Sequence, residues 1–263
     1  MLGKLLKYDL KYMIKNMSVF YILAFVFAIL TRVFFAVEDS LIFNIIAQIC
    51  NGTMISMICS IMINTMLRSW IRFRDSIYKD ESYLTHTLPV TKNAIYDSQF
   101  IQSLLFFVVG FIVIIACLFI AYYTEAKWTL LKEFVSTSIA GLNVSFTTFI
   151  ILMLVIIFLE IYNAIQCGFF GMILGHRQNN SKVLLSVCFG FIAYMVVQSA
   201  ILGMMFIVAL FDEGLMQMFT SNVLSNVESF KLLVILTIVF YIVVILFMRF
   251  ICKKLFNKGV DVE

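Results

Sequence analysis

The sequence predicts an all-helical integral membrane protein with six transmembrane helices. Its 263 residues are 63% hydrophobic and only 13% charged, which lies well outside the usual composition of soluble domains. Apolar runs of membrane-spanning length recur along the chain, and lysine and arginine gather in alternate connections between them. These observations indicate one polytopic transmembrane domain over residues 1–263, with little material for a separate soluble domain.

Six apolar runs are long enough to cross a bilayer, which takes about 20 residues of helix. They are residues 18–37, 41–67, 100–122, 146–174, 183–211 and 232–251. We expect helices because a backbone in lipid must satisfy its own hydrogen bonds, and because the runs lack the alternation of a membrane β-strand. The first run is not followed by a small-residue cleavage pattern, so we interpret it as a retained span.

The distribution of basic residues predicts the orientation. Six spans place both termini on the same side as the connections 68–99 and 175–182. That side holds all 19 lysines and arginines except Arg32, Lys127, Lys132 and Lys231. Because connections rich in lysine and arginine stay in the cytoplasm, we predict that both termini are cytoplasmic. The basic residues thus report membrane topology and give no support to nucleic-acid binding.

Three segments outside the spans predict helices at the membrane surface. The first 16 residues, MLGKLLKYDLKYMIKN, repeat lysine at steps of three and four and repeat leucine and methionine on another face. This pattern predicts an amphipathic helix in the inner interface, with its cations near anionic lipid headgroups; a simple anchor and a mechanical role both fit it. Residues 124–138 and 212–230 predict helices or re-entrant turns at the outer interface.

Motifs for catalysis are absent from the sequence. The chain's only Gly-Lys pair, Gly3-Lys4, is far from any phosphate-loop context, and no Gly-x-Ser-x-Gly elbow occurs. His86 and His176 lack the neighbours of a helical zinc motif. The six cysteines have no paired spacing of the kind that a metal or redox site needs. We therefore expect no catalytic residues, no metal site, no cofactor and no enzyme activity in this chain.

The stretch DESYLTHTLP, residues 80–89, is the most polar neighbourhood in the chain and lies in the first inner connection. Its serine can cap a helix and Pro89 stops it, which predicts a short helix of about two turns. Tyr83, Leu84 and Leu88 fall at helical spacing. This face fits either a docking surface for a partner or packing on the protein's own helix ends.

The segment DESYLTHTLPV, with Asp97-Ser98 entering the next span, closely resembles the coupling-loop region of bacterial type-2 ABC exporter permeases. The layout resembles theirs too, with a basic amphipathic start, six spans, a long first inner connection and a short second one. The resemblance implies a bacterial plasma-membrane protein whose loop helix seats in a groove of a separate ATPase subunit, which binds ATP and Mg²⁺. It also implies that two permease chains pair, as a homodimer or a pseudo-dimer, and that substrate leaves between them.

The resemblance also implies which residues contact the ATPase. The coupling helix and its flanks supply Asp80, Glu81, Tyr83, Leu84, His86, Leu88 and Pro89. The second inner connection supplies His176 and Arg177 as lesser contacts.

Polar residues inside the spans cost free energy unless they face protein or water. Glu160 lies near the middle of the fourth span, and Arg32 is a candidate partner if the first and fourth spans meet. The candidates for a translocation pathway or gate are Asn44, Gln48, Asn51, Glu160, Asn163 and Gln198. Hydrogen bonding between packed helices explains the same residues without transport, and Gly171 and Gly175 form a small-xxx-small pair that is typical of close packing.

Together these features predict the transmembrane subunit of an ATP-driven exporter, with a dimeric pathway for a hydrophobic or amphipathic substrate. The resemblance points to peptides, such as phenol-soluble modulins or antimicrobial peptides, and walls rich in Phe and Met adapt to varied apolar faces. The alternative is an ATP-independent channel or ion-coupled carrier in which Glu160 is the coupling group. That alternative predicts more charged residues along the path and inverted repeats.

Overall fold

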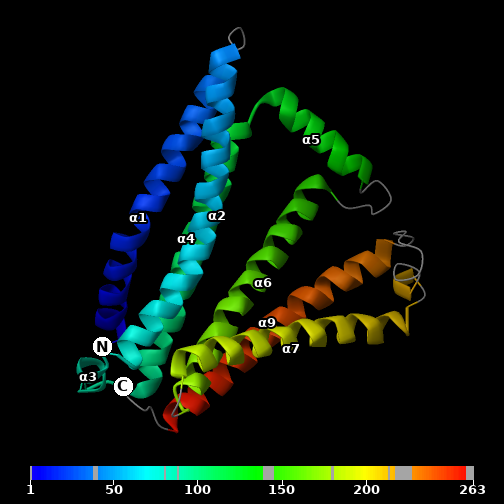
Figure 1. Cartoon of the computed structure of the whole chain (residues 1–263). Coiled ribbons are helices and arrows are strands. Elements are labelled where there is room, and N and C mark those ends of the chain that lie inside the picture. Colours follow the sequence, from blue (N-terminus) through cyan, green and yellow to red (C-terminus); the bar gives the residue numbers. More distant parts are fainter. Residues whose placement is uncertain are drawn as a thin grey trace. The chain divides into compact units, whose positions relative to one another are not determined.

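The computed structural model describes residues 2–37, 41–79, 81–87, 89–138, 145–178, 181–212, 214–216 and 227–258. These residues form α-helices joined by short connections, and none of them lies in a β-strand (Figure 1). Six of the described helices are long and apolar enough to cross a membrane. The predicted all-helical architecture with six helices of membrane-spanning length is therefore confirmed for the described residues.

The six long helices match the six predicted spans, and two shorter helices lie between them among the residues for which complete helix bounds are described. The long helices are α1 (Leu2–Phe35), α2 (Leu41–Ile77), α4 (Lys92–Tyr122), α6 (Phe146–Gly175), α7 (Lys182–Ala209) and α9 (Val227–Asn257), and the shorter ones are α3 (Ser82–Thr87) and α5 (Glu125–Ser138). Several long helices extend past the apolar runs that predicted them. For example, α4 begins eight residues before the apolar run that starts at residue 100, because the Thr91 side chain caps it by accepting a hydrogen bond from the Ala94 backbone nitrogen.

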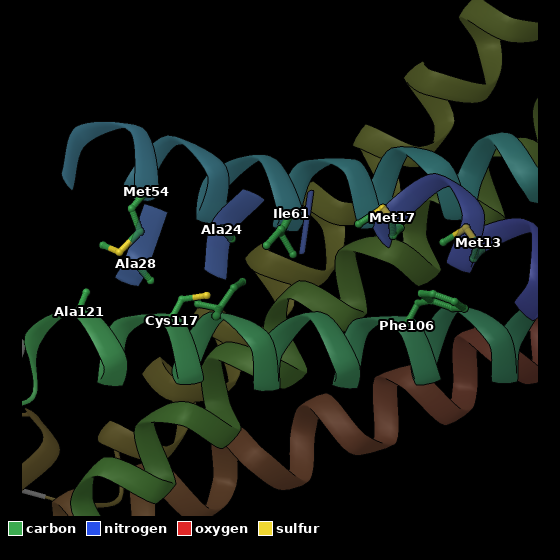
Figure 2. Close-up of a cluster of buried hydrophobic side chains, with 10 residues drawn as sticks. Met13, Met17, Ala24, Ala28, Met54, Ile61, Phe106, Cys117 and Ala121 are labelled. Carbon is green, nitrogen blue, oxygen red and sulfur yellow. The ribbon is translucent and has the colours of Figure 1, made fainter. Parts of the chain in front are cut away.

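The described helices group into two compact units, one within Met1–Lys127 and one within Trp128–Gly259. We call them the N-terminal unit and the C-terminal unit. In the N-terminal unit, α1, α2 and α4 pack against one another. Figure 2 shows Met13, Met17 and Ala28 of α1 facing side chains of α2 and α4 in its apolar core. Ala24 and Ala28 are fully buried in this core, and such small side chains allow helices to pack closely.

The N-terminal amphipathic segment is not a separate helix. It forms the first turns of α1, which runs without a break from Leu2 to Phe35, because neither glycine nor proline interrupts the chain after Gly3. Met13 and Met17 are fully buried against α2 and α4, whereas Lys7 on the opposite side is exposed. The apolar stripe therefore packs on protein, and a separate interfacial helix is not confirmed.

In the C-terminal unit, α6 packs against both α7 and α9. The α6–α7 crossing is so close that a Cβ atom added at Gly171 would overlap the backbone nitrogen of Gly190 and the carbonyl oxygen of Ser186. A Cβ atom at Gly175 would overlap Ser186 as well. These two glycines are the small-xxx-small pair of the sequence, and their packing role is seen directly.

Asp212 lies just after α7 and makes hydrogen bonds to described residues that follow it in the chain. Its carboxylate accepts hydrogen bonds from the Ser229 hydroxyl at 2.8 Å and from the Leu215 backbone nitrogen at 3.1 Å. Its carbonyl oxygen accepts one from the Met216 backbone nitrogen at 3.0 Å, so Asp212 caps the helical residues 214–216. The hydrogen bond from Ser229 lowers the pKa of the Asp212 carboxyl below its ordinary value, and the hydrogen bond from the Leu215 backbone adds a smaller effect in the same direction.

Acidification is expected to release this cap. Because the pKa of Asp212 is lowered by folding, its contribution to stability is present above the ordinary carboxyl pKa and is lost as the pH falls through the folded value. Amide hydrogen exchange at residues 214–216, corrected for intrinsic rates, should lose protection in that acid range. Asp212→Asn should abolish the pH-dependent step, and an undiminished step in this variant would contradict the assignment.

Candidate functional site

The short helix α3 has an unusual distribution of side chains. It lies between α2 and α4 in the chain and packs against α2. Ser82 and Thr85 are 0% and 7% exposed, whereas Tyr83 is 66% exposed. Among the described side chains of this helix, those of Ser82 and Thr85 are thus turned toward the protein, whereas those of Tyr83 and Thr87 are exposed.

The predicted contact residues around α3 are described only in part. Pro89 is exposed, in agreement with a position at the end of the helix. Asp80 and Leu88 lie outside the described residues, as do the side-chain positions of Leu84 and His86. Their role as ATPase contacts stays a prediction.

A buried charge network lies beside α3 and centres on Arg72 of α2. The Arg72 Nε and Nη2 atoms lie 2.9 and 2.8 Å from Oδ1 of Asp9, and Nη1 lies 2.6 Å from Oε2 of Glu81. The Arg72 and Asp9 side chains are 3% and 2% exposed, and that of Glu81 is 40% exposed. One arginine therefore joins a buried carboxylate on α1 to a half-exposed carboxylate at the start of α3.

The second carboxylate oxygen of Asp9 is also satisfied. It accepts hydrogen bonds from Ser98 Oγ at 2.9 Å and from Gln99 Nε2 at 3.0 Å, both on α4. The Arg72 guanidinium also lies over the rings of Tyr8 and Tyr12, at 5.3 and 4.9 Å from their centroids. We call Asp9, Arg72, Glu81, Ser98 and Gln99 the Arg72 network; it connects α1, α2, α4 and the start of α3.

Sequence reasoning missed this network apart from Glu81. Asp9 is the one acidic residue in the basic first segment, and it falls four residues before Met13, in the stripe that proves to be buried. That position was the available signal, since a carboxylate on a buried face needs a partner. Arg72 contributed only to the predicted topology, because its partner Asp9 is 63 residues away.

The two residues predicted in the second inner connection hold the C-terminal unit together. His176 is buried, and its Nδ1 lies 3.0 Å from the Met172 carbonyl oxygen and 3.3 Å from Ser186 Oγ. Arg177 donates a hydrogen bond to the carbonyl oxygen of Leu255. The ends of α6, α7 and α9 are thereby tied together, and an ATPase contact by these residues stays a prediction.

The polar residues predicted on the second span face different ways. Asn44 and Gln48 are exposed on the N-terminal unit, whereas Asn51 is half-buried and accepts a hydrogen bond from the Tyr122 hydroxyl of α4. Asn51 therefore has a packing role. Asn44 and Gln48 point away from the core of their unit, and a role in a pathway stays a prediction for all three residues.

In the C-terminal unit, Glu160 and Gln198 come together. Both side chains interact with Tyr194 of α7 and Tyr241 of α9, and sequence reasoning had not singled out Tyr241. Asn163, one turn from Glu160, is fully buried. Arg32, the suggested partner of Glu160, donates to the Ile120 carbonyl oxygen at 3.1 Å within the N-terminal unit; its pairing with Glu160 stays a prediction.

The described helices thus define a multi-pass helical membrane protein with a charge network beside a short helix between two spans. Among the described residues, no group of three or more His, Cys, Asp or Glu side chains is placed to hold a metal ion. No protein-family model matches the chain, and neither a curated protein nor a solved structure matches it significantly.

Proposed function

We propose that this chain is the transmembrane subunit of an ATP-driven exporter, and that α3 docks into a separate ATPase subunit. The observation that supports this most directly is the exposure of Tyr83 on a helix that is held against α2. Tyrosine is enriched among the residues that dominate binding energy at protein interfaces. A ring held outward on a fixed helix is suited to enter a groove on a partner.

The resemblance of the DESYLTHTLPV segment to exporter coupling loops implies that the partner is an ATPase, and the helical state of residues 82–87 agrees with that resemblance. Coupling requires that movement of the docked helix reach the membrane helices. The contact between Arg72 and Glu81 supplies such a connection, because Arg72 lies on α2, a helix long and apolar enough to span the membrane.

The exposed amides on α2 support a pathway formed with other parts of the assembly. Asn44 and Gln48 lie on an apolar helix and point away from the core of the N-terminal unit. Amides that face lipid are costly, so such residues are expected to face protein or water. A second copy of the chain across the pathway and an amphipathic peptide within it would both meet this need.

A second candidate function is an ATP-independent carrier that uses Glu160. The observation that favours it is the polar environment of this carboxylate, with Tyr194, Gln198 and Tyr241 around it on helices apolar enough to span the membrane. Polar groups at such positions often mark ion or substrate paths. Transport by the chain alone in vesicles, abolished by Glu160→Gln, would favour this function over the exporter.

The docking proposal predicts a specific loss of binding. Tyr83→Glu should lower the amount of the ATPase encoded beside this chain that co-purifies with it, by about tenfold or more, because it places a charge in an apolar groove. Tyr83→Phe should keep most of the binding. Phe134 on α5, which is 73% exposed, offers a matched control, and Phe134→Glu should leave co-purification unchanged. Equal recovery with Tyr83→Glu and with wild type would contradict docking through α3.

A further inference from the structure

We infer that Arg72 is a positioning residue that fixes α3 to the ends of α1, α2 and α4, so that these four elements move together. The attachment of α3 to these helices concerns this chain alone. Its consequence for export rests on the proposed function. The inference follows from three features of the Arg72 network: where its charges are buried, which atoms of the guanidinium are used, and where Glu81 lies relative to α3.

The burial of the network is uneven along its length. Asp9 and Arg72 are almost completely buried, whereas the Glu81 side chain is 40% exposed. Because separating a buried ion pair leaves an uncompensated charge, the Asp9–Arg72 contact is costly to break, and the Glu81 contact is built on it. Glu81 is therefore the replaceable end of the network and the place where α3 can be released without unfolding the unit.

The guanidinium uses different atoms for its two partners. Nε and Nη2 face Asp9, and Nη1 faces Glu81. Such a fork has a fixed planar geometry that the single ammonium of lysine does not reproduce. Asp9 is itself held from α4 by Ser98 and Gln99. The orientation of Nη1 toward Glu81 is thus set by contacts on three helices.

Glu81 lies at the start of α3 and is joined to it through its backbone. Its carbonyl oxygen accepts hydrogen bonds at 2.9 Å from both the backbone nitrogen and the hydroxyl group of Thr85. The side chain of Glu81 thus holds Arg72 while its backbone begins the helix. A displacement of α3 by a docked partner would pull on Arg72 and, through it, on α1, α2 and α4.

The attachment of α3 through Glu81 and Arg72 is tested by hydrogen exchange on the full chain in lipid nanodiscs, without any partner. Glu81→Gln and Arg72→Lys should each raise the exchange of the amides in residues 82–87 by about tenfold or more, since the first removes the negative charge that Arg72 contacts and the second removes the guanidinium fork that serves both carboxylates. Exchange in the core of α1, α2 and α4 should stay slow in Glu81→Gln. Asp75→Asn is a matched control, because Asp75 makes a partly exposed ion pair with the adjacent Arg74 at 3.1 Å.

The outcomes separate this inference from the proposed function. Unchanged exchange of residues 82–87 in Glu81→Gln would overturn the attachment, whatever the partner does. In the complex with the ATPase encoded beside this chain, Glu81→Gln should retain the ATPase while losing the stimulation of ATP hydrolysis by an amphipathic helical peptide. Full stimulation in this variant would overturn transmission through Arg72. Failure of the wild-type chain to bind the ATPase would instead refute the proposed function and leave the exchange result to decide the attachment.

Discussion

Replacing Arg72 with methionine is expected to destabilise the N-terminal unit by about 3–5 kcal/mol, because removing one partner of a buried ion pair leaves the other charge uncompensated. Asp9 would remain 2% exposed with only the Ser98 and Gln99 hydrogen bonds to satisfy it. Unfolding by a denaturing detergent, followed by the loss of helical signal, measures the change. Arg74→Met is the control on the same helix, since the Arg74–Asp75 pair is partly exposed and such a pair is worth about 1 kcal/mol.

A double variant distinguishes the uncompensated charge from lost packing. Asp9→Leu combined with Arg72→Met replaces both charges by apolar groups, and such exchanges are often close to neutral. The double variant should therefore recover at least half of the stability that Arg72→Met loses. If the two substitutions are simply additive, or if Arg74→Met costs as much as Arg72→Met, Arg72 does not act as the counter-charge of Asp9.

Adding a single methyl group at Gly171 is expected to destabilise the C-terminal unit by about 1–3 kcal/mol, and more if the backbone of α7 has to shift. The new Cβ atom of Gly171→Ala would overlap the backbone of Ser186 and Gly190, and backbone atoms give way less easily than the end of a flexible side chain. The expected result is earlier aggregation on heating in detergent, measured by the fraction of protein that remains monodisperse.

Gly203 provides the matched control for this prediction. It lies on α7, the same helix as Gly190, and a Cβ atom there would meet no other atom within 4 Å. Gly203→Ala should be neutral or stabilise the protein by up to about 1 kcal/mol, because alanine restricts the unfolded chain. Equal stability of Gly171→Ala and Gly203→Ala would show that the α6–α7 crossing is looser than described.

The membrane-spanning helices could be predicted from the sequence because length and hydrophobicity are local properties of a segment. The ends were less accurate: α2 continues past residue 67 to Ile77, where polar residues such as Ser69 and Arg72 are buried by α1 and α4. Local periodicity does not show what covers a face. The same limit explains why the stripe of Met13 and Met17 was assigned to the lipid interface although it packs on protein.

The candidate site could be predicted only in its short-range part. Residues 80–89 drew attention through their polarity and their resemblance to a known loop, and Ser82–Thr87 is helical in the structure. The partners of Asp9 lie 63, 89 and 90 residues along the chain from it, and such pairings require the tertiary fold. Similarly, Tyr241 joins Glu160 and Gln198 only when α9 packs beside α6.

The central claim is that ATP hydrolysis by a partner subunit drives export through this chain, and the rate of ATP hydrolysis tests it most directly. The chain is purified in nanodiscs with the ATPase encoded beside it, and hydrolysis is followed with and without an amphipathic helical peptide. We predict that peptide stimulates hydrolysis by the wild-type complex and that Tyr83→Glu, introduced on the exposed face of α3, removes both complex formation and stimulation. An ATPase that neither binds the wild-type chain nor responds to peptide would contradict the account and favour a carrier that depends on Glu160.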